Sequence, residues 1–315
     1  MFFFFRYYKE ITESIIGSKE KSSGHQSNNE DIKLRNEAIS SLTHSTGIHQ
    51  LLPRFIAFFH EGIKCNVTNF NSQNSDRPSS IAYYRILGNL LKMVEALNLN
   101  VNISLEDYIH EILPGLFTCC LSNKVVIKHY NKQFHAREFS AKLISSICKC
   151  YSSSSNMLEV RITSQCEKVI RSPNSSIHSL YGSIYLLIKL GEDTMEHFIH
   201  LVKLVFEKTK QEFKNNENFN NNNSISNNNN PNISAEIVTA KEMDRLVFSG
   251  CASSSEGLYK TNENIMLPIL VKIYQKGRLE RCGKSVEEFE EFFGERFGSF
   301  VYNFIFGGSD RMEVN

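Results

Sequence analysis

The segment from Leu105 to Cys120, LEDYIHEILPGLFTCC, indicates the fold class of the chain. Counted from Leu105, its apolar residues fall at offsets 3, 4, 7, 8, 11, 12 and 15, which follow the 3.6-residue period of an α-helix. Ser104 comes just before the stretch and Asp107 three residues later, so we expect Ser104 to cap the helix. Pro114 is expected to kink or break the helix, because its ring clashes with the carbonyl four residues back.

Apolar stripes with the same period recur along the chain. They lie at 51–63, 87–97, 139–147, 177–188 and 198–206. The predicted helices come in pairs that start near residues 48, 104 and 158, a step of about 50 residues that is close to the length of a HEAT or armadillo unit. No run alternates with a period of two for long enough to predict a sheet. The sequence therefore predicts an all-α protein, an α-solenoid of HEAT-like helical repeats, with a compact helical bundle as the alternative.

Two segments of biased composition divide the chain. Residues 17–31 are almost entirely polar and predict a loop, and residues 215–232 contain 12 Asn in 18 positions, which predicts disorder. The predicted organisation is a helical linker and polar loop at 1–32, a HEAT-repeat domain at 33–212, an Asn-rich linker at 213–233 and a C-terminal helical extension at 234–315.

Charge and hydropathy exclude several classes of protein. The 315 residues include 35 Lys and Arg against 34 Asp and Glu, a net charge of +1, so direct DNA binding is not expected. No stretch approaches the roughly 18 apolar residues of a membrane span, and no membrane association is expected. The start, with Phe at positions 2–5, lacks the apolar core and cleavage site of a signal peptide. We therefore expect a reducing compartment in which the 8 cysteines stay reduced.

Motifs for catalysis or for metal binding are incomplete. The cysteine groups Cys119-Cys120 and Cys148-x-Cys150 lack the C-x₂₋₄-C spacing of zinc sites, so packing is the preferred interpretation. His60-Glu61 and His110-Glu111 lack the second histidine of H-E-x-x-H. Glycine-rich nucleotide-binding motifs and the G-x-S-x-G elbow are also missing. The sequence therefore predicts no catalytic residue, no cofactor and no metal.

Two basic segments and one aromatic segment leave alternatives open. Lys124–Arg137 and Lys272–Lys284 are mildly basic; a solvated helix face is favoured over contact with phosphate or an acidic partner. Phe289–Phe306 predicts one aromatic helix, which belongs to a core by default and would mark a partner site if its face were exposed.

Several short motifs, in order, resemble one known family. They are Tyr7–Glu13, Gly47–Phe55, Phe59–Val67, Leu90–Leu97, Leu105–Cys120, Ala136–Ala141, Ile147-Cys148, Arg161–Thr163 and Tyr181–Ile184. Together they resemble the C-terminal HEAT-repeat domain of TATA-box-binding-protein-associated factor 6, subunit 6 of the general transcription factor TFIID. The resemblance covers about 7–210, roughly two-thirds of the chain.

The resemblance implies a non-enzymatic scaffold in the nucleus. Family members sit in TFIID and, in many organisms, also in SAGA-type coactivator complexes, where they support assembly of the RNA polymerase II preinitiation complex through protein–protein contacts. The implied partners are other TFIID subunits, and self-association of the HEAT domain is implied as well. A HEAT-repeat adaptor in another process, such as transport, is the alternative.

The chain departs from the family pattern in three respects. The histone fold that pairs with subunit 9 in the family has no counterpart here, so this pairing is not expected from the chain as it stands. The insert at 66–80 and the Asn-rich tract are not family features, and 234–315 matches poorly. Where the family usually has Trp ahead of an Ala-Leu-Arg-Asp run, this chain has Phe134.

Eight polar positions within the motifs are candidate functional residues. They are Glu61, Asn66, His110, Glu111, Arg137, Glu138, Arg161 and Tyr181. We expect them at helix ends and between repeats, where they form hydrogen bonds that fix repeat stacking or contact a partner. Stacking is the preferred role of the two.

Overall fold

The computed structural model describes residues 2–17, 25–72, 79–122, 130–205, 207–208, 285–293 and 295–306. All regular structure in these ranges is helical, which confirms the predicted all-α class. The predicted Asn-rich linker, 213–233, and the basic segment Lys272–Lys284 lie outside them. Within the described part, no helix combines the length and the hydropathy needed to cross a membrane. The chain forms two compact units, Met1–Tyr151 and Ser152–Asn315.

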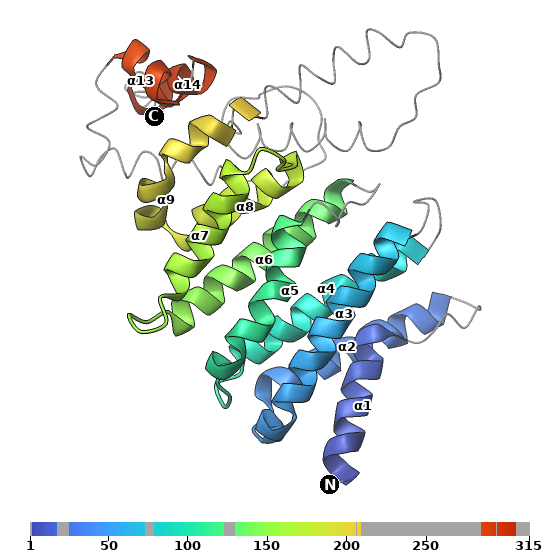
Figure 1. Ribbon diagram of the computed structural model, residues 1–315. Coiled ribbons are helices and arrows are strands. Elements are labelled where there is room, and N and C mark those ends of the chain that lie inside the picture. Colours follow the sequence, from blue (N-terminus) through green and yellow to red (C-terminus); the bar gives the residue numbers. More distant parts are fainter. Residues whose placement is uncertain are drawn as a thin grey trace, which may run out of the picture. The chain divides into compact units, whose positions relative to one another are not determined.

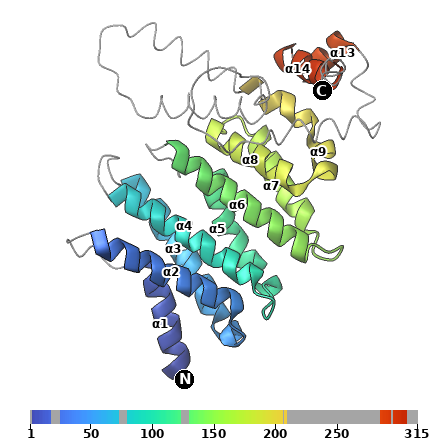
Figure 2. The same ribbon diagram turned by 180° about the vertical axis from the view of Figure 1, so that it is seen from behind.

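Within its described ranges, the first unit consists of three helix pairs (Figure 1). The helices are α1 (Phe2–Ile16), α2 (His25–His44), α3 (Leu52–Ser72), α4 (Ser79–Leu99), α5 (Ile109–Leu121) and α6 (Tyr130–Tyr151). Each odd-numbered helix packs against the even-numbered helix that follows it. The second helices also form a row, in which α4 contacts both α2 and α6, while α3 contacts α5 in the other layer (Figure 2). This stacking of successive pairs in two layers is the HEAT-like arrangement that the periodicity predicts.

Apolar side chains at helical spacing fill the space between these layers. Phe55 and Phe59 of α3 are fully buried, and so is Leu116 of α5. α3 and α5 approach closely at Gly115, where an added Cβ would come within 2.7 Å of Cε1 of Phe59. A larger residue at 115 would therefore separate the two helices.

The helix predicted over Leu105–Cys120 begins later than predicted. A 3-10 turn, η2 (Glu106–Tyr108), precedes α5, and the Ser104 hydroxyl accepts a hydrogen bond from the Glu106 amide at 3.3 Å. α5 then continues through Pro114 without a break. Pro114 lies in the second turn and on the exposed side of α5, so the carbonyl left without a helical donor, that of His110, is close to water.

The predicted polar loop at 17–31 is too long. α2 begins at His25, inside that segment. No glycine or proline interrupts the sequence from 25 to 46, and the inner face of α2 buries Ala38 and Leu42. Packing of that face outweighs the weak helix propensity of the polar residues before it.

Among its described residues, the second unit has a further pair of the same kind. α7 (Leu158–Arg171) packs against α8 (Ile177–Leu190), which also contacts α9 (Glu192–Phe198). The described elements at the C-terminal end are α13 (Val286–Phe293) and α14 (Glu295–Phe306). The prediction of one aromatic helix over Phe289–Phe306 is therefore wrong. The two helices pack on each other through the Phe289 and Tyr302 rings, 5.6 Å apart in an edge-to-face arrangement, so these aromatic side chains serve a local core.

Candidate functional site

A buried arginine joins the two helices of one pair. Arg137 of α6 is fully buried; its Nη1 donates to the carbonyl oxygen of Cys120 at 2.8 Å, and Nη2 donates to that of Ser122 at 2.7 Å. Both carbonyls lie at the C-terminal end of α5, where backbone acceptors have no helical donor and the helix dipole favours a positive charge. Arg137 therefore holds the end of α5 against α6.

A lysine makes the same kind of contact in the second unit. The Lys208 ammonium donates to the carbonyl oxygens of Ile170 and Ser172, both at 2.6 Å, at the end of α7. Burial lowers the pKa of Lys208. Ser172, like Ser122, has an extended backbone conformation and donates its amide back into the helix. α5 and α7 thus end in the same way, 50 positions apart in the sequence. In each, a cationic side chain donates to the carbonyl oxygens of two equivalent residues at the helix end.

Two asparagine side chains donate hydrogen bonds to carbonyl oxygens at the C-terminal ends of α1 and α2. The sequence analysis did not predict either of them. Asn89 of α4 is buried and donates to the Ile15 carbonyl oxygen at the end of α1, at 2.9 Å. Asn100, just after α4, donates to the carbonyl oxygens of Leu42 at 2.7 Å and Ser45 at 2.9 Å, at the end of α2. α4 and the residue that follows it therefore hold the C-terminal ends of both α1 and α2. Asn is common in this chain, so its type gave no signal.

Two other candidate residues, Asn66 and Tyr181, are also buried. Asn66 of α3 is 5% exposed and donates from Nδ2 to the carbonyl oxygen of Gly62 at 2.6 Å, one turn back in its own helix. Tyr181 of α8 is 2% exposed and stacks on Tyr185, with ring centroids 6.0 Å apart. Both contacts lie within one helix, and neither side chain is available to a large partner.

The exposed candidates are Glu61, His110, Glu111 and Arg161. Glu61 lies 3.9 Å from Lys64, and the His110 imidazole lies 3.7 Å from Glu111. Such exposed pairs contribute little to stability. The two His-Glu motifs therefore lie on helix surfaces, as expected.

Glu138 is half-buried beside Tyr84. The pKa of Tyr84 is raised to about 12, mainly by burial; a hydrogen bond with the Ala136 backbone opposes the shift, and the negative charge of Glu138 adds to it. The phenol therefore stays neutral at physiological pH. Since Tyr84 belongs to α4 and Glu138 to α6, this neighbourhood lies between successive helices of the row.

The cysteines of α5 behave as packing residues. Cys119 and Cys120 are both fully buried, and burial raises the pKa of each thiol to about 12. The nearby Arg137 charge acts in the opposite direction but does not outweigh burial. In the part of the chain that the structure describes, no three His, Cys, Asp or Glu side chains are grouped so as to hold a metal ion.

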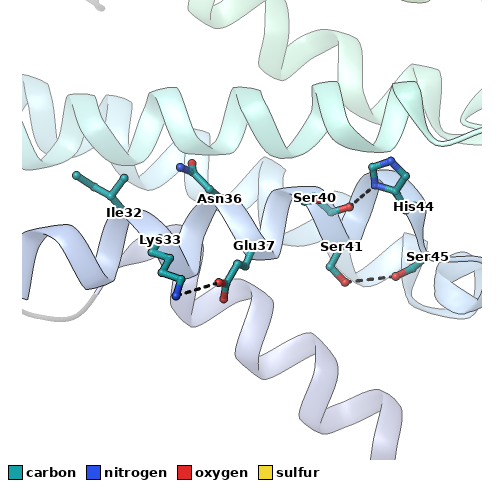
Figure 3. Close-up of a pocket in the computed structure, with 8 residues that line it drawn as sticks. All are labelled: Ile32, Lys33, Asn36, Glu37, Ser40, Ser41, His44 and Ser45. Atoms are coloured by element: carbon teal, nitrogen blue, oxygen red, sulfur yellow. Dashed lines mark hydrogen bonds and ion pairs between the residues drawn. The ribbon is translucent and has the colours of Figure 1, made fainter.

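A shallow hollow of about 880 Å³ follows one side of α2. Figure 3 shows its lining, which comes from α2 and the residue after it: Ile32, Lys33, Asn36, Glu37, Ser40, Ser41, His44 and Ser45. Lys33 and Glu37 lie 3.9 Å apart, and Ser41 is 2.8 Å from the Tyr7 hydroxyl of α1. The hollow is open, most of its lining residues are of polar types, and the charges of Lys33 and Glu37 balance each other. It offers hydrogen-bonding groups to a neighbour but no enclosed pocket for a reaction.

Comparison with known proteins finds one family. The family model of the TAF6 C-terminal HEAT repeat domain matches residues 5–202. Transcription initiation factor TFIID subunit 6 of Drosophila melanogaster is 34% identical over 194 residues, which are 61% of this chain and 28% of that protein. The protein of the same name from Arabidopsis thaliana is 28% identical over 191 residues, 58% of this chain and 32% of that protein.

A fission yeast protein and a solved structure are also similar. The SAGA complex/transcription factor TFIID complex subunit Taf6 of Schizosaccharomyces pombe is 25% identical over 190 residues, 60% of this chain and 36% of that protein. The TAF6 C-terminal domain from Antonospora locustae is 23% identical with a TM-score of 0.47, and covers 67% of this chain and 86% of that chain. The matched region spans about a third of the length of each curated relative. Because the family model matches more than half of the chain, the protein belongs to the family of the TAF6 C-terminal HEAT repeat domain.

Proposed function

We propose that this chain is a non-enzymatic scaffold subunit of TFIID that acts in the nucleus. It supports assembly of the RNA polymerase II preinitiation complex through protein–protein contacts of its HEAT repeats. The observation that carries the proposal is the family match over residues 5–202, together with relatives that are named as TFIID subunit 6. The name of the fission yeast relative extends the proposal to a SAGA-type complex.

The use of the buried polar side chains supports a scaffold role. The side chains of Arg137, Asn89 and Asn100 donate hydrogen bonds to backbone carbonyl oxygens at helix ends. Such bonds keep successive helix pairs in register and leave long helical surfaces for other proteins. In the described residues, the hollow on α2 is open rather than enclosed, which fits a binding surface better than a reaction site.

The eight candidate residues divide into two roles in this proposal. The buried ones have structural roles: Arg137 joins two helices, and Asn66 and Tyr181 make contacts within their own helices. The exposed ones, Glu61, His110, Glu111 and Arg161, contact other subunits, and the half-buried Glu138 lies at the edge between the two sets. The partners are other TFIID subunits and a second copy of the HEAT domain.

The test is affinity purification of the tagged endogenous protein from nuclear extract, followed by mass spectrometry. The expected result is co-purification of TATA-binding protein and several other TFIID subunits. Recovery of SAGA-specific subunits in the same sample would extend the assignment to that complex.

An untagged strain is the control for material that binds the resin. The tagged chain must remain soluble and elute from size exclusion as a folded species. Under those conditions, recovery of no TFIID subunit would contradict the proposal.

A further inference from the structure

Two arginines from different helices meet at the end of α1. An added Cβ on Gly17 would lie 3.7 Å from Nη2 of Arg35, on α2, and also 3.7 Å from Nη2 of Arg85, on α4. Gly17 has a φ of +84° and donates its amide to the Glu13 carbonyl oxygen at 2.9 Å, which is the usual left-handed end of a helix. Two guanidinium groups therefore border the same small space beside one glycine.

Within the described residues, the one anionic group that acts on Arg35 is Asp31, and it does not form an ion pair with either arginine. Neither guanidinium forms an ion pair there within 4.0 Å, and Nε of Arg35 is buried without a hydrogen-bond acceptor. Arg35 is only 9% exposed, so water does not easily replace the missing acceptor. Arg85 is exposed and opens the space to solvent.

The charges around Arg35 make this arrangement unfavourable as it stands. Burial lowers the pKa of Arg35, the charge of Arg85 lowers it further, and Asp31, one turn earlier on α2, opposes both. The end of α1 could attract positive charge, but two of its last carbonyls are already occupied. Asn89 donates to Ile15, and Gly17 donates to Glu13. Among the described residues, neither arginine donates a hydrogen bond to a carbonyl of this helix end, so capping of α1 does not explain their approach.

We propose that Arg35 and Arg85 form a binding site for an oxyanion carried by a protein partner. A carboxylate or a phosphoryl group has two or more oxygens, so it can accept hydrogen bonds from both guanidinium groups and relieve their repulsion. The partner thus presents an acidic or phosphorylated side chain at the end of α1. This inference does not depend on the identity of the complex in which the protein acts.

The first experiment uses the full chain and inorganic phosphate. Isothermal titration calorimetry is carried out with sodium phosphate at constant ionic strength, which is maintained with NaCl. Wild type is expected to bind phosphate, and Arg85→Gln to bind about tenfold more weakly, because one charge-assisted contact is lost. Lys92→Gln removes one positive charge from the exposed side of the same helix and is expected to bind as wild type does.

The stability of the phosphate-free protein separates the proposal from a purely structural role. If the arginines form an empty anion site, Arg85→Gln unfolds at the same or a higher urea concentration than wild type, because a repulsion has been removed. If they only hold the end of α1, Arg85→Gln unfolds at a lower concentration. Arg85 is exposed, so this variant folds even if replacement of the buried Arg35 does not.

Two labelled peptides identify the source of the oxyanion. Fluorescence anisotropy is measured with hexaglutamate and with a phosphoserine peptide, each competed with phosphate. Selective binding of the first assigns a carboxylate, and of the second a phosphoryl group. The proposal is overturned if wild type binds none of the three probes, if Lys92→Gln weakens binding as much as Arg85→Gln does, or if Arg85→Gln is destabilised without phosphate.

Discussion

The Arg137 guanidinium bridges two carbonyl oxygens of α5, that of Cys120 at 2.8 Å and that of Ser122 at 2.7 Å. Arg137 is fully buried, and its contact joins the two helices of one pair at the negative end of a helix dipole. An arginine is suited to this position because its planar fork reaches both oxygens at once.

Replacement of Arg137 by alanine is expected to destabilise the protein by about 2–4 kcal/mol, since two carbonyls lose their donors and a cavity opens. Urea unfolding followed by circular dichroism measures the change. Arg137→Lys is the matched variant; it keeps the charge but not the fork, and its midpoint should fall between wild type and alanine. If Arg137→Ala unfolds like wild type but loses its partners, the residue is a contact residue instead.

Asn100→Ala is expected to cost about 1–3 kcal/mol, because the carbonyls of Leu42 and Ser45 are left without their donor. Hydrogen exchange should show faster opening at the C-terminal end of α2. Asn102→Ala serves as the control, because Asn102 is exposed and donates only to the Asn100 side chain. If both variants had equal effects, the loss of stability would come from the turn at residues 100–102 and not from the hydrogen bonds of Asn100 to the end of α2.

The thiols of Cys119 and Cys120 are expected to resist alkylation at pH 8, since burial raises their pKa to about 12. Cys65 and Cys150 are exposed and should react quickly. Alkylation with iodoacetamide followed by peptide mass spectrometry distinguishes these sites. Addition of denaturant should make all four reactive. Rapid labelling of Cys119 in the native protein would contradict the buried position of this part of α5.

Because the pKa values of Cys119 and Cys120 are raised in the folded protein, we expect the protein to lose stability at high pH. A thiol whose pKa rises from 9.0 when unfolded to about 12 when folded favours the native state below pH 9, and this contribution is lost as the pH rises towards 12. Urea midpoints measured between pH 7 and pH 11 should fall above pH 9. The Cys120→Ala variant should show a shallower fall than wild type. An identical pH dependence in the two proteins would be evidence against this linkage.

The free energy of unfolding of the double variant His110→Ala, Glu111→Ala is expected to lie within about 0.5 kcal/mol of the wild-type value, because both side chains are exposed and their pairing is weak. Its recovery of TFIID subunits should decrease if the exposed face of α5 is a contact surface. Lys142→Ala, an exposed residue on α6, is the control for general surface effects. Unchanged recovery would remove His110 and Glu111 from the proposed contact set.

The periodicity of apolar residues was sufficient to predict the helix pairs, because burial of one helix face requires that spacing wherever a pair is stacked. It did not predict where α2 begins, since His25 and its neighbours are polar and join the helix through packing further along. It also gave no reason to expect the aromatic segment to divide into α13 and α14.

The contacts at helix ends were predictable only in part. Arg137 stood out because it lies within a family motif, but the motif did not indicate which carbonyl oxygens it would contact. Asn89 and Asn100 could not be separated from the many other asparagines, and the meeting of Arg35 and Arg85 joins residues 50 positions apart. Such contacts depend on tertiary geometry, which a local pattern does not contain.

The helix-end bonds also have an evolutionary consequence. Their acceptors are backbone carbonyls, which every amino acid supplies, whereas their donors are particular side chains. Mutational drift at Ile15, Leu42 or Cys120 therefore leaves the acceptor in place, while drift at Asn89, Asn100 or Arg137 removes the donor. Each bond thus restricts substitution at one of its two positions only, and homologous chains can diverge widely and still lock the same helix ends.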